Sequence, residues 1–206
     1  MATQPVLTAD RISLRPIRLR DAAAWREVRQ RNRDWLSKWD ATSPLGMADV
    51  PPTFAAMVRA LRSEARAGRT LPWVITYDGK LVGQLTIGGI AYGSLRSAHA
   101  GYWVAQEVAG HGIAPTALAM GIDYCFRHLG LHRIEVNIRP ENAASRRVVE
   151  KLGLRYEGLR DRYLHIDGDW RDHVSYAITA EEVPEGLVAR AMLAASDPAK
   201  PLTNDY

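Results

Sequence analysis

Hydrophobic and polar residues alternate in several short stretches of the chain, a pattern typical of strands that bury one face. The first stretch runs from residue 11 to residue 18. Two later pairs of apolar stretches flank Asp-Gly dipeptides, and this dipeptide favours a two-residue hairpin turn. The alternation predicts these hairpins at 73–87 and 160–178, and further strands at 97–105 and 133–138.

Helical periodicity separates the predicted strands. Apolar residues three and four positions apart predict helices that begin after Asp21 and Thr53, both of which are suitable N-caps. A longer amphipathic run ends at Leu129, and a shorter one follows Asn142, which is a third N-cap candidate. A last amphipathic helix is predicted over residues 180–195.

Strands and helices alternate along the chain without an internal repeat or an evident linker. This order predicts one α/β (α+β) domain. The domain is expected over residues 1–195, and the tail 196–206 is expected to be flexible. A chain of 206 residues is long enough to bury one substantial core.

Composition narrows the class of protein. Apolar residues make up 47% and charged residues 24%, as in soluble globular proteins. No apolar run is long enough to span a bilayer, and the N-terminus lacks the features of a secretion signal. The single cysteine, Cys125, excludes an internal disulfide and is expected to be buried in a helix. These features fit a cytoplasmic protein without a membrane partner.

The positive charge of the chain is concentrated near its N-terminus. The net charge is +4, but eight arginines lie between residues 11 and 33. Such a segment could face nucleic acid, a ribosomal surface or an acidic substrate. A solvated face with acidic partners elsewhere in the fold is the favoured interpretation, because the chain has no recognisable nucleic-acid module.

A glycine turn precedes the longest predicted helix. Gly110 and Gly112 stand before it, and Pro115 is expected at its first position. Helix N-termini expose unpaired N–H groups, and a glycine turn lets them approach a phosphate. The spacing matches neither a dinucleotide fingerprint nor a P-loop. Phosphate binding and a purely structural turn therefore remain alternatives.

A second polar pair marks the next helix. Asn142 and Ser145 are three residues apart, so both lie on one face of the helix start, and Gly153 is expected to cap the other end. No group of Cys, His and Asp has convincing metal-ligand spacing, so no metal is expected.

Taken in order, these motifs resemble the GNAT N-acetyltransferases, and within them the RimJ/RimL-type enzymes that acetylate the N-termini of ribosomal proteins. The cofactor motif of the family, Gln/Arg-x-x-Gly-x-Gly/Ala, reads here as residues 109–114, and its Asn-x-x-Ser pair is Asn142 with Ser145. The run 163–174 and the opening 7–16 also fit. The resemblance covers residues 6–180, and the order and spacing of the motifs make it specific.

The resemblance implies a central mixed, mostly antiparallel sheet, flanked by helices and splayed open where acetyl-CoA binds. The pyrophosphate would lie on the glycine turn, and the pantetheine arm would pair with the strand edge at 103–105. Asn142 would touch that arm, and Ser145 would lie near the sulfur. The implied cofactor-binding residues are Trp103, Val104, Ala105, Ala109, Gly110, His111, Gly112, Ile113, Ala114, Asn142 and Ser145.

Two positions depart from the family pattern. Ala109 replaces the usual Gln or Arg, which removes a side chain but leaves the backbone donors, so cofactor binding is expected to survive. His99 stands where many relatives carry a glutamate.

The expected chemistry needs a neutral amine and a stabilised thiolate. A peptide α-amine has a pKa of roughly 8, so a weak base acting through water is sufficient. His99 and Glu135 are candidate bases, although each could be an ordinary strand residue. Ser145 is the candidate that supplies a hydroxyl proton to the leaving group. Candidates to line the acceptor side are Tyr163, His165, Asp172 and His173.

The sequence therefore predicts an enzyme that moves acetyl from acetyl-CoA directly to a primary amine. The favoured acceptor is the N-terminal α-amine of a protein, such as a ribosomal protein. The alternatives are a small-molecule amine acceptor, such as a polyamine or an aminoglycoside, and an acyl-CoA-binding regulatory module without turnover. A monomer or a homodimer is expected, without direct binding of nucleic acid.

Overall fold

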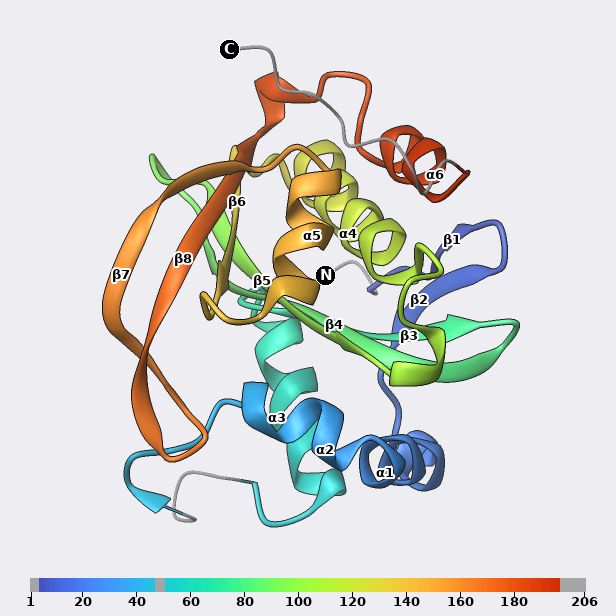
Figure 1. Ribbon diagram of the computed structural model, residues 1–206. Helices are drawn as coiled ribbons and strands as arrows, with labels where there is room; N and C mark the ends of the chain where they lie inside the picture. The colour runs from blue at the N-terminus through green and yellow to red at the C-terminus, as the bar shows by residue number, and fades with distance from the viewer. Residues whose placement is uncertain (1–3, 47–50, 197–206) are drawn as a thin grey trace.

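The computed structural model describes residues 4–46 and 51–196, and most of the described chain forms a sheet with helices on both faces (Figure 1). The sheet has eight strands in the order β1-β2-β3-β4-β5-β6-β8-β7, and every pairing is antiparallel except that of β5 with β6. The strands are β1 (Leu7–Ala9), β2 (Ile12–Pro16), β3 (Leu71–Tyr77), β4 (Lys80–Ala91), β5 (Ser97–Val104), β6 (Arg133–Ile138), β7 (Arg155–Ile166) and β8 (Asp169–Thr179). The predicted mixed, mostly antiparallel sheet is confirmed.

The helices form two layers. In Figure 1, α4 and α5 cover one face of the sheet, and α1, α2 and α3 lie beyond the other face. The α-helices are α1 (Ala22–Arg31), α2 (Arg33–Leu36), α3 (Phe54–Arg66), α4 (Ile113–Leu129), α5 (Ala143–Lys151) and α6 (Val188–Ser196). Short 3-10 turns are η1 (Leu19–Asp21), η2 (Ser37–Trp39), η4 (Gln106–Val108) and η5 (Ala180–Glu182). In the described chain, no helix is long and apolar enough to cross a membrane.

Each helix layer encloses its own part of the core. The larger cluster lies between the sheet and α4, and includes Trp73 and Leu118, both fully buried. The smaller cluster joins α1 and α3 to the sheet around Val58 and Val74. Cys125 is buried in α4 as predicted, and burial raises the pKa of its thiol to about 12. The thiol therefore stays protonated and unreactive, and the side chain packs in the core.

Local turn chemistry explains both predicted hairpins. Asp78 and Gly79 have φ of 48° and 76°, and Asp167 and Gly168 have φ of 50° and 79°. Positive φ at both central residues gives the twist that a two-residue hairpin turn needs. The second hairpin, β7 with β8, is long and curves away from the rest of the sheet (Figure 1).

Three local predictions are corrected. The last helix begins at Val188, because residues 180–182 form a 3-10 turn and Gly186 has φ of 88°. Pro115 is the third residue of α4, because the helix begins at Ile113; proline fits there since first-turn amides have no partner. Asp21 precedes α1 as predicted, but its side chain does not cap that helix.

The predictions for the chain ends have different outcomes. The expected extent of the domain, residues 1–195, stays a prediction. Of the expected flexible tail, Ser196 ends α6, and the remainder lies outside the described residues.

The opening of the sheet depends on an incomplete strand pairing. β5 and β6 pair only from Ser97 with Arg133 to His99 with Glu135. Beyond those residues, β5 continues along β4 and β6 continues along β8, so the two strands separate. A register shift between β4 and β5 lies next to His99. The extra residue is on β4, and bulges of this kind bend the bulged strand and increase the local twist.

The arginine-rich first segment is partly neutralised within the fold. Arg15 pairs with Asp21, Arg29 pairs with Asp40, and Arg31 pairs with Glu27 and Glu107. The guanidinium of Arg29 also lies over the rings of Trp25 and Trp103. For these arginines, the interpretation of a face with acidic partners elsewhere in the fold holds.

Asp21 provides a test of this internal pairing. Its carboxylate is buried and accepts hydrogen bonds from the Arg15 guanidinium at 2.8 and 2.9 Å and from the Arg18 N–H at 2.8 Å. Burial by itself raises the pKa of Asp21, but these bonds outweigh it and hold the pKa below its ordinary value. We expect Asp21→Asn to lower the free energy of unfolding by about 1–3 kcal/mol at pH 7.

Urea unfolding at several pH values measures this effect. Because the folded pKa is depressed, the stabilisation is complete above the ordinary carboxyl pKa and is lost as pH falls through the folded value. The difference between wild type and Asp21→Asn should therefore shrink below about pH 4. Asp78→Asn, which removes an exposed pair with Arg11, is the matched control and should change stability much less. Equal effects of both variants would contradict the expectation.

Candidate active site

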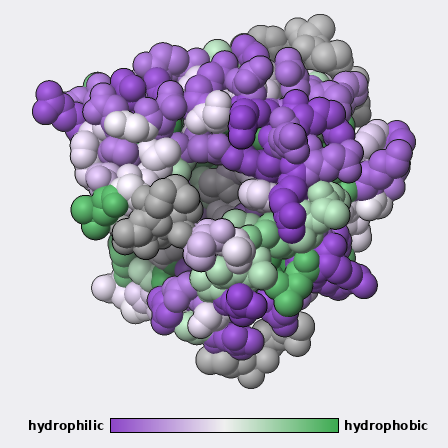
Figure 2. All heavy atoms as spheres, turned by 90° about the horizontal axis from the view of Figure 1, so that it is seen from below, coloured by the Kyte–Doolittle hydropathy of each residue, from purple (hydrophilic) through white to green (hydrophobic). Residues whose placement is uncertain are grey.

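Two cavities meet where the sheet opens. The large cavity, of about 440 Å³, lies between the end of β5, the glycine turn and the first turns of α4 and α5. The small cavity, of about 240 Å³, lies between the separating parts of β5 and β6 and the β7–β8 hairpin. Figure 2, seen from below, shows a hollow on the face of the molecule below the sheet. Both cavities are lined by Trp39, Tyr102, Asn142 and Ser145.

The glycine turn and the first residues of α4 line the large cavity. Gly110 and Gly112 have φ of 85° and 75°, a conformation that glycine adopts readily. Thr116 donates to the Gly112 carbonyl at 3.1 Å, and Pro115 has no N–H. Ile113 and Ala114 come before these residues, and the first amides of a helix have no partner within the helix. Their amides belong to the helix start, which is where anions bind.

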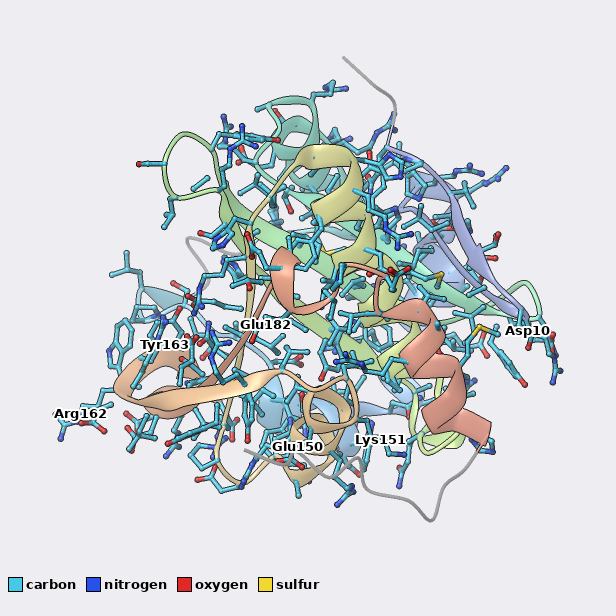
Figure 3. All side chains as sticks on the ribbon, turned by 90° about the horizontal axis from the view of Figure 1, so that it is seen from above. Asp10, Glu150, Lys151, Arg162, Tyr163 and Glu182 are labelled. Carbon is cyan, nitrogen blue, oxygen red and sulfur yellow. The ribbon has the colours of Figure 1, made fainter. Side chains whose placement is uncertain are left out.

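Charged side chains at the large cavity add to the positive potential of the helix start. Lys38, Arg147 and Lys151 line it, and Glu141 is the carboxylate among its described lining residues. Figure 3 shows Lys151 at one end of α5. The excess of cations complements a ligand with several phosphate groups. The residues of the large cavity thus fit the pyrophosphate-bearing cosubstrate that the sequence predicts.

The edge of β5 forms another wall of the large cavity. Val104 lies there with its carbonyl accepting a hydrogen bond from the Trp35 indole at 3.2 Å. A carbonyl oxygen has a second lone pair, so a ligand can still pair with this edge. The Ala105 amide instead donates to the Val82 carbonyl at 2.8 Å, which directs it toward β4.

Ser145 and Tyr102 join the two cavities. Their hydroxyl oxygens are 2.8 Å apart, and the Tyr102 hydroxyl also lies 3.3 Å from the Ser145 carbonyl oxygen. The Asn142 side-chain oxygen accepts from the Ser145 amide at 3.1 Å and caps α5, as predicted. Burial raises the pKa of Tyr102 strongly, although its bond to Ser145 opposes the rise, so the phenol stays neutral. Sequence reasoning missed Tyr102, although strand alternation puts it on the same face as buried Ala100.

The predicted cofactor-binding residues mostly gather at the large cavity. Ala105 and His111 are not among its described lining residues. His111 is exposed, and its Nδ1 lies 3.1 Å from the Ala109 carbonyl oxygen. Those that do line the cavity are Trp103, Val104, Ala109, Gly110, Gly112, Ile113, Ala114, Asn142 and Ser145.

The two predicted bases lie away from this junction. Among the described residues, neither His99 nor Glu135 lines either cavity. The His99 ring packs on the backbone of Gly88 and Gly89; this loss of water lowers its pKa, although the Glu135 carboxylate opposes the shift. The structure brings Ser145, but not His99 or Glu135, to the meeting point of the cavities. The catalytic roles of His99 and Glu135 stay predictions.

The side chain of Glu135 is already held by ion pairs. Its two oxygens accept from Arg133 at 3.0 Å and from Arg160 at 2.9 Å. Both carboxylate oxygens of Glu135 are therefore engaged by guanidinium groups.

Of the predicted acceptor-side residues, His173 reaches the small cavity. It is 3% exposed and lines the cavity together with apolar residues of the hairpin such as Leu164 and Ile166. His165 instead contacts the Thr42 hydroxyl at 2.7 Å, and Asp172 accepts from the Arg162 amide at 2.8 Å. Tyr163, labelled on β7 in Figure 3, packs edge-on against the His173 ring at a centroid distance of 5.6 Å.

Comparison with known proteins identifies the class of this fold and site. Residues 11–155 match the model of the acetyltransferase (GNAT) domain, so the chain belongs to the GNAT family of acetyltransferases. The predicted family and the predicted enzyme class are thereby confirmed. Enzymes of this family use acetyl-CoA, which is therefore the acetyl donor of this chain, as predicted.

Individual relatives show which part of the family is similar. The chain is 48% identical to a structure described as Mycobacterium smegmatis RimJ in complex with CoA-disulfide, with a TM-score of 0.82 over 89% of this chain and 88% of that one. It is 29% identical to the [ribosomal protein uS5]-alanine N-acetyltransferase of Escherichia coli over 87% of this chain and 93% of that protein. A probable N-acetyltransferase of Bacillus subtilis, YjcK, is 39% identical over 101 residues. This matched part makes up 49% of this chain and 56% of that protein.

Gly112 tests the placement of the phosphates. Gly112→Asp adds a negative charge at the helix start, and its φ of 75° also disfavours any side chain. We expect calorimetry to show severely weakened CoA binding by a folded Gly112→Asp variant. Gly112→Asn has a side chain of nearly the same shape and a similar tolerance of positive φ but no charge, so it should retain more affinity. Unchanged affinity in Gly112→Asp would place the phosphates elsewhere.

Proposed function

We propose that this enzyme acetylates the N-terminal α-amine of a protein, a ribosomal protein in the cytoplasm being the favoured client. Acetyl-CoA would bind in the large cavity, and the amine would enter through the small one. The observation that supports this arrangement best is the meeting of the two cavities at Ser145 and Tyr102.

The leaving group is the first chemical problem that the site has to solve. Bound acetyl-CoA supplies a thioester, whose sulfur must depart as a thiolate or thiol. The Tyr102 hydroxyl can donate to the Ser145 hydroxyl oxygen, because the raised pKa keeps it protonated. The proton of Ser145 is then free to point at the sulfur. In this proposal Ser145 is the donor and Tyr102 orients it.

The acceptor side favours a neutral amine. No carboxylate is among the described residues that line the small cavity, and Arg139 supplies a positive charge there. A polyamine or a lysine ammonium would enter without a counter-charge. An α-amine loses its proton more readily, and the cavity of about 240 Å³ suits a small first residue.

The names of the relatives agree with that choice. The [ribosomal protein uS5]-alanine N-acetyltransferase of Escherichia coli is similar over most of its length. A structure described as ribosomal-protein-S5-alanine acetyltransferase from Vibrio fischeri is 25% identical, with a TM-score of 0.74 over 85% of this chain and 96% of that one. Both names specify the alanine of a ribosomal protein.

Ser145→Ala and Tyr102→Phe test the leaving-group proposal. Loss of one donor in a preorganised site costs roughly 10²-fold in kcat, and we expect somewhat less for Ser145→Ala because water can substitute. CoA affinity by calorimetry should change little. If Tyr102 acts through Ser145, Tyr102→Phe should slow turnover in wild type and have no further effect in the Ser145→Ala background. Equal turnover of Ser145→Ala and wild type would leave Ser145 as an ordinary first-turn serine of α5.

A competition among amines tests the acceptor. Peptides that begin with alanine or serine should be acetylated faster than lysine side chains or spermidine, since at pH 7 the neutral fraction of an α-amine exceeds that of a lysine by about 10²-fold. Mass spectrometry locates the acetyl group, and thiol release measures the rate. Acetylation confined to lysine side chains or polyamines would reject the N-terminal proposal. Absence of thiol release with every amine would favour a non-catalytic module.

A further inference from the structure

We propose that His173 is the general base that removes the proton from the attacking amine. The inference rests on the proposed function, because it assumes that the small cavity admits the amine. It assigns a role that the sequence leaves open between His99 and Glu135.

The position of His173 is the first argument. It lies on β8, is 3% exposed, and lines the small cavity that also reaches Ser145. Among the described lining residues of that cavity, the groups that can titrate are Tyr102, Arg139 and His173. Tyrosine and arginine titrate far above neutral pH, so the histidine is the group suited to accept a proton there.

The hydrogen bonds of His173 fix which nitrogen is basic. Its Nδ1 lies 2.9 Å from the Arg171 carbonyl oxygen. A carbonyl oxygen only accepts, so Nδ1 carries the hydrogen and donates it. In the neutral ring, Nε2 therefore has the free lone pair. The Tyr163 ring packs edge-on against His173 and restricts its rotation.

The surroundings of His173 keep the ring neutral near pH 7. Burial lowers its pKa, and Arg139 lowers it further. The Arg171 carbonyl and the carboxylates of Asp172 and Glu141 act in the opposite direction, but the net shift is downward. A neutral imidazole is ready to accept a proton at the pH where an α-amine is partly deprotonated.

The step balances with one base and one donor. The amine nitrogen forms a bond to the acetyl carbon, the carbon–sulfur bond breaks, and the nitrogen loses one proton to Nε2 of His173. The sulfur leaves with its electron pair, hydrogen-bonded to Ser145. One proton then passes from the imidazolium through water to the thiolate, which restores neutral His173 and gives free CoA thiol.

His173→Asn is the central variant. The asparagine amide can still donate to the Arg171 carbonyl from the position of Nδ1, but it offers no base at Nε2. We expect kcat to fall by about 10²-fold or more, as for loss of a general base, with CoA affinity unchanged by calorimetry. His132→Asn, at an exposed histidine that lines neither cavity, is the matched control and should keep wild-type turnover, while His99→Asn tests the rival base. The acceptor is whichever amine wild type acetylates fastest, so a wrong acceptor assignment does not affect this comparison.

Two further measurements separate catalysis from packing. Wild-type kcat should fall at acid pH as His173 becomes protonated, and His173→Asn should lose that acid limb. Added imidazole should restore turnover in His173→Ala, where it can occupy the space left by the ring. In wild type without ligand, an NMR titration should give His173 a pKa below the ordinary value of about 6.5.

The opposite results would overturn the proposal. Wild-type turnover in His173→Asn would exclude a base at this position. His173 would have a structural role if its variants lose turnover, imidazole does not restore the activity of His173→Ala, and His173→Asn keeps the acid limb of its pH profile. If His173→Asn does not fold, as judged by circular dichroism and CoA binding, His173→Gln and the rescue of His173→Ala decide the same question. A large loss in His99→Asn alone would identify His99 as the base.

Discussion

The site depends on the early end of the pairing between β5 and β6. These neighbours share three residue pairs, up to His99 with Glu135, and then follow β4 and β8 in different directions. Each strand beyond that point has one edge without a strand partner, and buried backbone groups need partners. A ligand arm laid along β5 can supply them. The same separation admits Ser145 of α5 and lets the two cavities meet.

The two cavities differ in charge, and this difference suits each of them to a different substrate. Lys38, Arg147, Lys151 and the start of α4 make the large cavity positive, which suits phosphates. The small cavity contains no carboxylate among its described lining residues, so it offers nothing to hold a permanent cation. A donor rich in negative charge and an amine that enters in its neutral form are thus directed to opposite sides of one junction.

Protonation at that junction is set by burial and by hydrogen bonds together. Burial raises the pKa of Tyr102 and lowers that of His173, which favours the neutral form of both groups near pH 7. Their bonds then fix the direction of the remaining protons: Tyr102 faces the Ser145 hydroxyl, and Nδ1 of His173 faces a carbonyl. A donor for the leaving group and an acceptor for the amine proton thus result from the surroundings of two neutral side chains.

Features that depend on near neighbours could be predicted from the sequence by itself: the Asp-Gly turns at 78–79 and 167–168, the caps at Thr53 and Asn142, and the glycine turn before α4. Their cause is the conformational preference of a few adjacent residues. Tertiary structure decided which distant polar groups meet. Tyr102 hydrogen-bonds to Ser145, 43 residues later in the chain, and Arg160 donates to Glu135, 25 residues earlier. Alternation indicates that His99 and His173 each face one side of a strand, but only the packing of the hairpin against the opened sheet determines which of them lies at the cavity.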